Sequence, residues 1–401
     1  MRPSERRREH LARFALVTGS AFASLVLLEI ALNVLTADIE RFHVWEPGTK
    51  ATFHTVRGTM PGVHGRSSFS VNAEGMRGDE FSPDHEYRIL TVGGSTTECL
   101  YLDQVETWPH LLQATLRNET GRNVFVGNIG KSGLNSREHY FQLKFLLEQY
   151  PDFDMVILLV GINDMSIRIS DPKYTPFDFE DPDEVEEVIE RAFMIQPLYE
   201  AERRSPFYKN TDVWRALEIL ADGTRSKDTV EDDAEVWYEK VRSYRRNAET
   251  IIDQLPDIQS GLDEYNRNVN KIIDVANDNA VELILVTQPV MWGTEDSDGN
   301  EDLLWFGGIG DFTKGESDAY YSVPALAEGM NRYNAELLSI CEERGSECLD
   351  LASLLPKGTL SFYDDAHFNE AGARAVAAIL SEYVLASKRI TEFHDGRGRA
   401  P

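Results

Sequence analysis

The sequence predicts an α/β fold with a parallel central sheet. From about residue 86 onward, short apolar segments typical of buried strands alternate with segments that have a helical period. This alternation is typical of parallel sheets with right-handed crossovers. Residues 155–160 are continuously apolar, as expected for a central strand that is covered on both faces. The 401 residues can hold one large α/β domain with additional segments, or two small domains.

The elements of the sheet and its helices follow one another in a regular order. The first strand ends at a pair of glycines, and the first helix has a proline near its start, where proline is well tolerated. The predicted strands are 88–92, 124–126, 155–160, 282–287 and 349–351, and the predicted helices are 108–116, 136–149, 262–279, 324–343 and 369–387.

The remaining segments define the expected domain organisation. About a hundred residues after Asp164 are not needed by the core and are rich in acidic side chains, with helices expected at 183–193, 212–220 and 234–252. We interpret them as a helical insertion that caps the site. The expected organisation is a cytoplasmic basic segment (1–13), a transmembrane signal anchor (14–35), a connector (36–85), an α/β core domain (86–388, with the insertion at 165–260) and a tail (389–401).

The N-terminus carries a predicted membrane anchor. Five arginines precede the apolar run 14–35, which is long enough to cross a hydrocarbon layer of ~30 Å. Arginines before such a run place the N-terminus in the cytoplasm and the following domain in the periplasm or outside the cell. The alternative is a cleaved signal peptide, because residues 21–23 form a usable cleavage pattern.

Charge and cysteine content limit the partners. A formal net charge of −28 would repel nucleic-acid backbones, so nucleic-acid binding is not expected. Cys341 and Cys348 could pair in an oxidising compartment, although the spacing alone leaves this open. No spacing of cysteines or histidines suggests a metal site, and no cofactor is predicted.

Three short motifs carry the chemistry. They are Gly-Gly-Ser-Thr-Thr-Glu at 93–98, Gly-Ile-Asn-Asp at 161–164 and Asp-Asp-Ala-His at 364–367. Each follows a predicted strand or lies between a strand and a helix. Because ligands of parallel sheets bind at the carboxyl ends of the strands, we expect the three motifs to lie close together.

The residue types in these motifs are those of nucleophilic acyl chemistry. Ser95 is the candidate nucleophile, and His367 is the candidate base that activates it. Asp364 can reach the other imidazole nitrogen and orient the ring, with Asp365 as the adjacent alternative. The candidate oxyanion donors are the backbone N–H groups of Ser95 and Gly133 and the side-chain amide of Asn163. Taken singly, each motif could also be an ordinary turn or helix cap.

The motifs resemble those of the SGNH (GDSL-type) hydrolases. Residues 93–95 resemble the first family block, with Gly94 where the family more often has Asp. Residues 128–133 (Asn-x-Gly-x-x-Gly), 161–164 and 364–367 resemble three further blocks. The resemblance covers about residues 86–388. It implies a flavodoxin-like three-layer sandwich, a triad of Ser95, His367 and Asp364, and an oxyanion hole of Ser95, Gly133 and Asn163.

The expected activity is therefore that of a membrane-anchored serine esterase, a carboxylic ester hydrolase. Its expected substrate is a small-molecule or carbohydrate ester, most simply an O-acetyl ester of an envelope or extracellular glycan. An O-acyltransferase with the same triad and a non-catalytic envelope-binding domain are the alternatives. Four residues near the later strands could line a substrate cleft, or could equally be ordinary loop packing: Gln288, Trp292, Trp305 and Tyr320.

Overall fold

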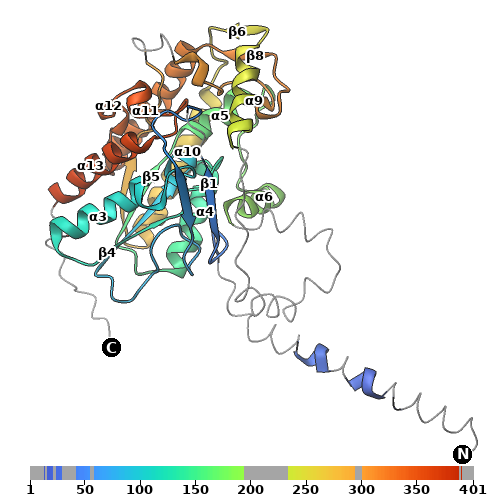
Figure 1. The fold of residues 1–401 in the computed structure, drawn as a ribbon, viewed down its shortest axis with the longest axis vertical. Helices are drawn as coiled ribbons and strands as arrows, with labels where there is room; N and C mark the ends of the chain where they lie inside the picture. The colour runs from blue at the N-terminus through green and yellow to red at the C-terminus, as the bar shows by residue number, and fades with distance from the viewer. Residues whose placement is uncertain are drawn as a thin grey trace, which may run out of the picture. The chain divides into compact units, whose positions relative to one another are not determined.

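The computed structural model describes residues 42–54, 58–193, 234–293 and 300–387, together with Ile390 and short pieces between residues 13 and 28. By its internal contacts the chain divides into two units, Met1–Phe42 with Ile195–Asp228, and His43–Met194 with Thr229–Pro401. The second unit contains every predicted site residue and the sheet that positions them (Figure 1).

Within the described residues, five parallel strands form the central sheet of this unit. Their order across the sheet is β4-β3-β5-β7-β9, which in chain order is 2-1-3-4-5, the flavodoxin-like arrangement. The predicted α/β class and parallel sheet are confirmed. The strands are β3 (Tyr87–Gly93), β4 (Val124–Asn128), β5 (Met155–Leu159), β7 (Glu282–Val286) and β9 (Glu347–Leu349).

The strand order also fixes where a site can form. After β3 the chain adds β4 along one edge of β3. It then crosses over and adds β5 along the other edge, so the order in which strands are added reverses between β3 and β5. In sheets of this kind the crevice outside the carboxyl ends of those two strands is the ligand site. Every residue of β3 and β5 is buried, because helices cover both faces. This explains the continuously apolar sequence of β5.

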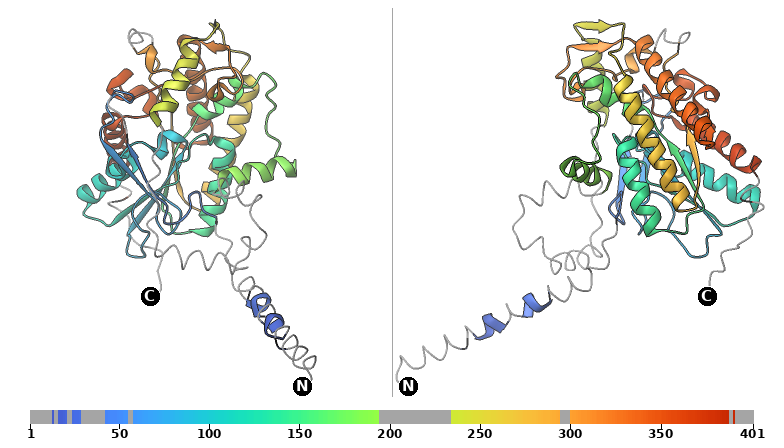
Figure 2. Two further views of the ribbon diagram at one scale, coloured as in Figure 1. Left: turned by 45° about the vertical axis from the view of Figure 1, so that its right-hand side comes forward. Right: turned by 180° about the vertical axis from the view of Figure 1, so that it is seen from behind.

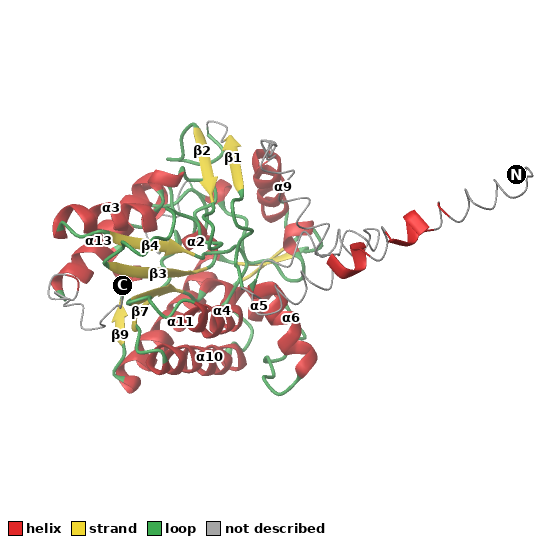
Figure 3. Cartoon of the chain, turned by 90° about the horizontal axis from the view of Figure 1, so that it is seen from below, coloured by secondary structure: helices red, strands yellow, loops and turns green. Residues whose placement is uncertain are grey.

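Helices cover the sheet on two sides, which gives three layers (Figure 3). One face carries the pair of helices α3 and α13, and the other carries α4, α10 and α11, with α4 and α10 packed along each other (Figure 2). These helices are α3 (Trp108–Thr120), α4 (Ser136–Gln149), α10 (Gln259–Asp278), α11 (Val323–Arg344) and α13 (Glu370–Ala386).

Helix α4 begins and ends where the sequence predicts, and its first turn shows why. The Asn135 side chain accepts a hydrogen bond from the Arg137 backbone N–H, while the Glu138 side chain accepts one from the Asn135 N–H at 2.9 Å. This reciprocal capping box satisfies N–H groups that have no partner inside the helix. It also fixes the end of the loop 129–135, which contains Gly133.

Three predicted elements differ from the structure or lie outside its described part. The helix expected at 234–252 ends earlier, as α9 (Ala234–Arg246), and β6 (Thr250–Ile252) pairs with β8 (Ala319–Tyr321) instead, because β-branched residues favour a strand. The strand expected at 349–351 is shifted, since Leu351 already begins α12 (Leu351–Leu354). The helix at 183–193 is present as α6 (Pro182–Ala192), and the one at 212–220 lies outside the described residues.

The connector before the sheet supports the nucleophile's segment. It contains an antiparallel hairpin of β1 (Lys50–His54) and β2 (Arg66–Ser70), followed by Arg77, whose side chain is fully buried. Its guanidinium donates to the carbonyls of Cys99 and Leu102, both at 2.8 Å. Burial lowers the pKa of Arg77 to about 10, although nearby acidic groups oppose this shift. The buried cation thus holds the chain just after α2 (Ser95–Glu98).

Cys341 and Cys348 form a disulfide that joins the end of α11 to β9. The pairing that the spacing left open is therefore present. Of the predicted transmembrane segment 14–35, only short pieces belong to the described residues. Among the described parts of the chain, no helix is both long and apolar enough to cross a bilayer.

Candidate active site

Ser95 lies at the reversal point of the sheet. It is the first residue of the short helix α2 and follows β3 directly after Gly94. As a first helical residue, Ser95 has a backbone N–H without an acceptor inside the helix. A side chain at position 94 would be too close to Asn163, since a Cβ there would lie 2.5 Å from Asn163 Nδ2. Gly94, which stands where the family more often has Asp, thus lies close to the Asn163 amide.

His367 and Asp364 reach Ser95 from the other end of the chain. They lie in the loop between η5 (Gly358–Leu360) and α13. His367 Nε2 is 2.7 Å from Ser95 Oγ, and His367 Nδ1 is 2.7 Å from Asp364 Oδ2. The loop folds back tightly, because the His367 backbone N–H also donates to Asp364 Oδ1 at 2.8 Å. The three predicted triad residues therefore form one continuous hydrogen-bonded chain.

The electrostatics of the triad favour an ion pair between His367 and Asp364. Burial would raise the pKa of Asp364, which is fully buried, but attraction to His367 and hydrogen bonds lower it to about 2. Burial would equally lower the pKa of His367, but the charge of Asp364 and their hydrogen bond raise it above its usual value. The imidazole is thus prepared to take a proton and to hold it as an imidazolium.

Asp365, the alternative acid, faces away from the imidazole. Its carboxylate accepts hydrogen bonds from Trp292 Nε1 at 2.9 Å and from the backbone N–H groups of Trp305 and Phe306 at 2.8 and 3.2 Å. The geometry therefore favours Asp364 as the partner of His367, in agreement with the spacing.

The loop after β4 brings Gly133 next to α2. The Asn128 side chain fastens this loop, donating to the Thr97 carbonyl and accepting from the Gly130 N–H, both at 2.8 Å. Gly133 has φ of +77°, a left-handed conformation that glycine adopts at little cost. Among the described hydrogen bonds none uses its backbone N–H, which is available to an oxyanion.

Asn163 completes the set of predicted oxyanion donors. It is the second residue of α5 (Ile162–Ser170), directly after β5. Its side-chain amide donates to the Leu134 carbonyl at 2.7 Å, which fixes the orientation of the amide and leaves its second hydrogen free to donate. Ser95, Gly133 and Asn163 line the same cavity, as an oxyanion hole requires.

That cavity has a volume of about 460 Å³ and also contains His367. Many of its lining residues are aromatic, and these come from the segment after α2, from the insertion, from the segment before α11 and from the catalytic loop. The aromatic lining residues include Trp237, Tyr238, Trp305, Phe306, Phe312 and Tyr363.

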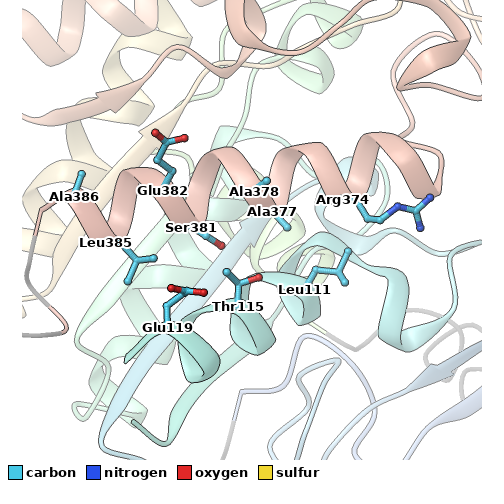
Figure 4. A pocket seen from close by; sticks show the side chains of 10 residues that line it. All are labelled: Leu111, Thr115, Glu119, Arg374, Ala377, Ala378, Ser381, Glu382, Leu385 and Ala386. Carbon is cyan, nitrogen blue, oxygen red and sulfur yellow. The ribbon is translucent and has the colours of Figure 1, made fainter. Parts of the chain in front are cut away.

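A larger hollow of about 680 Å³ lies between α3 and α13 (Figure 4). Its walls carry alanine, leucine and a few charged side chains, for example Glu119 and Arg374, and none of the predicted site residues. Size alone would point to this hollow, but it has no nucleophile with an adjacent base. The smaller cavity is therefore the candidate active site.

A profile of the GDSL-like lipase/acylhydrolase family matches residues 91–375, more than two thirds of the chain. The chain belongs to this family. It is accordingly a carboxylic ester hydrolase, an acyl ester hydrolase of the SGNH type, and the matched range contains the nucleophile and base described above.

Several solved structures are similar to this SGNH hydrolase. They include the acetylxylan esterase Axe2 from Geobacillus stearothermophilus (14% identity, covering 80% of this chain and 100% of that one, TM-score 0.39) and a carbohydrate acetylesterase family member from Sinorhizobium meliloti (12%, 75% and 98%, 0.39). A third is LAE5, an α/β hydrolase from the metagenome of Lake Arreo, Spain (13%, 74% and 94%, 0.38). All three have a low sequence identity to this chain. A comparison with curated protein sequences finds no significant match.

Of the four predicted substrate-binding residues, only Trp305 lines the cavity of this hydrolase. Gln288, Trp292 and Tyr320 are buried, with at most 3% of each residue exposed. Gln288 accepts a hydrogen bond from Thr96 Oγ1 at 3.3 Å, and Trp292 donates to Asp365. These three residues support the walls of the site instead of forming its surface, so the prediction is corrected for them.

Sequence reasoning missed the aromatic residues that the insertion contributes. Trp237 and Tyr238 lie on α9, which reaches over the cavity. The adjacent Trp-Tyr pair in an otherwise acidic and polar segment was the available signal. Arg242 on the same helix donates to the carbonyls of Thr59 and Tyr363 at 2.7 and 3.3 Å, which binds α9 to the catalytic loop.

Replacing Asn163 with Ala should lower kcat by roughly 10²–10³-fold with little change in KM. The amide is held at the end of a buried central strand, and it gains most from the oxygen once that oxygen is charged. Steady-state kinetics on a p-nitrophenyl ester would measure both constants, with thermal melting as the control for folding. A raised KM at unchanged kcat would make Asn163 a binding residue and remove it from the oxyanion hole.

Proposed function

We propose that this hydrolase is a serine esterase that removes small acyl groups, O-acetyl in particular, from an envelope or extracellular glycan. The observation that carries the proposal is the hydrogen-bonded chain from Ser95 through His367 to Asp364, with 2.7 Å at each link. It opens into a cavity that also contains the candidate oxyanion donors.

The proposed reaction has two steps that share one set of groups. Ser95 Oγ attacks the ester carbonyl while His367 Nε2 takes the hydroxyl proton, and the carbonyl oxygen becomes an oxyanion held by Ser95, Gly133 and Asn163. The tetrahedral intermediate collapses, the C–O bond to the alcohol breaks, and His367 returns the proton to the leaving alcohol. Water then attacks the acyl-enzyme by the same route, which releases the acid and regenerates Ser95.

The character of the cavity supports a small acyl group on a sugar. Its volume of about 460 Å³ is typical of sites for small molecules. Flat aromatic side chains such as Trp237 and Trp305 stand beside the nucleophile, and they can pack against the C–H faces of a sugar ring. An acidic chain with a net charge of −28 favours neutral substrates over polyanions.

The proposal is tested by the substrate range of the purified full chain in detergent. We expect hydrolysis of p-nitrophenyl acetate to exceed that of the octanoate, and we expect acetate release from acetylated oligosaccharides. The Ser95→Ala variant is the matched control for non-enzymatic release. Faster hydrolysis of long-chain esters, without acetate release from the oligosaccharides, would contradict the proposal. Acetyl transfer to an added oligosaccharide in preference to water would instead favour the acyltransferase.

We further propose that the domain lies outside the cytoplasm, anchored by the apolar segment 14–35. The arginines before this segment and the disulfide between Cys341 and Cys348 support this location, because disulfides persist in oxidising compartments. A reporter enzyme that functions only in the cytoplasm, fused to the C-terminus, should be inactive, whereas one that needs export should be active. The opposite result would place the domain inside the cell.

A further inference from the structure

Two adjacent buried carboxylates hold the same tryptophan, each at a different point. Asp364 Oδ2 accepts from the indole Nε1–H of Trp305 at 3.0 Å, besides its bond with His367 Nδ1. Asp365 Oδ2 accepts from the backbone N–H of Trp305 at 2.8 Å. The side chain of Trp305 is thus hydrogen-bonded to Asp364, and the main chain of Trp305 is hydrogen-bonded to Asp365.

Trp305 also touches the catalytic base and the substrate cavity. Its ring lies nearly parallel to the imidazole of His367, at an interplanar angle of 9° and a centroid distance of 6.3 Å. It lines the cavity beside Trp237, whose ring it meets edge to face at 5.2 Å. One side chain therefore contacts Asp364, His367 and the space where the substrate binds.

Trp305 is remote from the catalytic loop along the chain, about 60 residues before Asp364. Asp365 supplies the connection between the two segments: its carboxylate accepts from the Trp305 and Phe306 backbones, and from the indole of Trp292 at 2.9 Å. In the described part of the chain all these donors are neutral N–H groups. Burial and the charge of Asp364 raise the pKa of Asp365, while the charge of Arg245 and these hydrogen bonds oppose the rise, so the donors help to compensate a carboxylate that is costly to bury.

We propose that Asp365 is a positioning residue for the triad and acts through Trp305. It holds the Trp305 segment against the catalytic loop, and the indole N–H then fixes the Asp364 carboxylate in the plane that His367 Nδ1 needs. The inference rests on the serine esterase chemistry proposed above. It assigns separate roles to the two neighbouring acids: Asp364 pairs with the imidazole, and Asp365 keeps the donor that orients Asp364.

The test uses Trp305→Phe and Asp365→Asn in the full chain, singly and together. Phenylalanine keeps an aromatic ring against His367 but removes the N–H donor, and asparagine keeps the size of the side chain but puts an amide NH₂ among N–H donors. We expect kcat for p-nitrophenyl acetate to fall by about tenfold in each single variant, since each loses hydrogen bonds to a charged group. The double variant should fall no further than the more impaired single one, because both act on the same contact.

A pH profile separates positioning from a merely structural role. The charged groups that act on His367 are Asp364, Asp365 and Glu98. Without the indole N–H, the Asp364 carboxylate is no longer held toward His367 Nδ1 and raises the pKa of the imidazole less, so the acid limb of kcat/KM should move to lower pH in Trp305→Phe. Trp237→Phe alters the same cavity wall without removing a donor to the triad. It should change KM and leave the acid limb in place.

The outcomes are distinct. Independent, multiplicative losses in the double variant, or an acid limb in Trp305→Phe that stays in place or moves to higher pH, would overturn the proposal. If Asp365→Asn fails to fold, the pH profile of Trp305→Phe still tests whether the indole N–H positions Asp364. The rate at which a fluorophosphonate labels the enzyme keeps the two proposals apart. No labelling of the wild type would refute the serine esterase chemistry, whereas normal labelling of the wild type, with Trp305→Phe and Asp365→Asn labelled as fast as the wild type, would refute only the positioning role.

Discussion

Ser95→Ala should lower kcat for ester hydrolysis by roughly 10⁶-fold. The Ser95 hydroxyl is the group that His367 Nε2 contacts at 2.7 Å, and no other hydroxyl is bonded to this nitrogen among the described residues. The protein should stay folded, because the oxygen that is lost faces a cavity and the start of α2 is held by backbone hydrogen bonds. Initial rates on p-nitrophenyl acetate, with circular dichroism and thermal melting of the same preparation, would measure both effects.

A folded Ser95→Ala protein that hydrolyses esters at the wild-type rate would refute the assignment of the nucleophile. Ser132 is the matched comparison, since it lines the same cavity but its hydroxyl donates to Glu98 and not to a histidine. Ser132→Ala should retain most of the activity that Ser95→Ala loses.

Asp364→Asn should cost about 10⁴-fold in kcat, far more than Asp365→Asn. An amide at position 364 no longer carries the charge that stabilises the imidazolium, and its NH₂ group would favour the wrong tautomer of His367. The Asp365 carboxylate has no hydrogen bond to the imidazole and acts on it through its charge and through Trp305, so its loss costs less. Comparison of kcat for the two variants on one ester decides between them, and the reverse ranking would assign the triad acid to Asp365.

The same variant should change the pH profile in a defined direction. His367 acts as a base only when it is neutral, so activity falls as the pH drops below its pKa. In the wild-type enzyme Asp364 raises that pKa against the opposing effect of burial. Without this charge burial dominates, and the acid limb of kcat/KM should move to lower pH. A shift to higher pH would mean that Asp364 does not stabilise the imidazolium.

The sheet and the triad could be predicted from sequence because their signals are local. A buried parallel strand is a continuous apolar run, and an α-helix such as α4 carries its own start in Asn135 and Glu138. The nucleophile and the Asp-x-x-His pair each lie within a few residues of such a strand or helix. Once the strands are parallel, their carboxyl ends meet at one edge, so the motifs come together without knowledge of the loops.

The walls of the cavity could not be predicted in this way, because they depend on how distant segments pack. Trp292 and Trp305 are both tryptophans in the segments that follow β7, yet one is buried against Asp365 and the other faces the cavity. Trp237 reaches the site only because Arg242 and Arg245 bind α9 to carbonyls of remote loops, including those of Tyr363 and Phe306. No local pattern in the sequence indicates these contacts.

The most direct test of the account is the identity of the residue that becomes covalently modified. The full chain is treated with a fluorophosphonate and digested, and the modified peptide is mapped by mass spectrometry. We expect one adduct, on Ser95, together with loss of esterase activity in proportion to labelling, and no adduct in Ser95→Ala. An adduct on another residue, or full activity after complete labelling of Ser95, would contradict it.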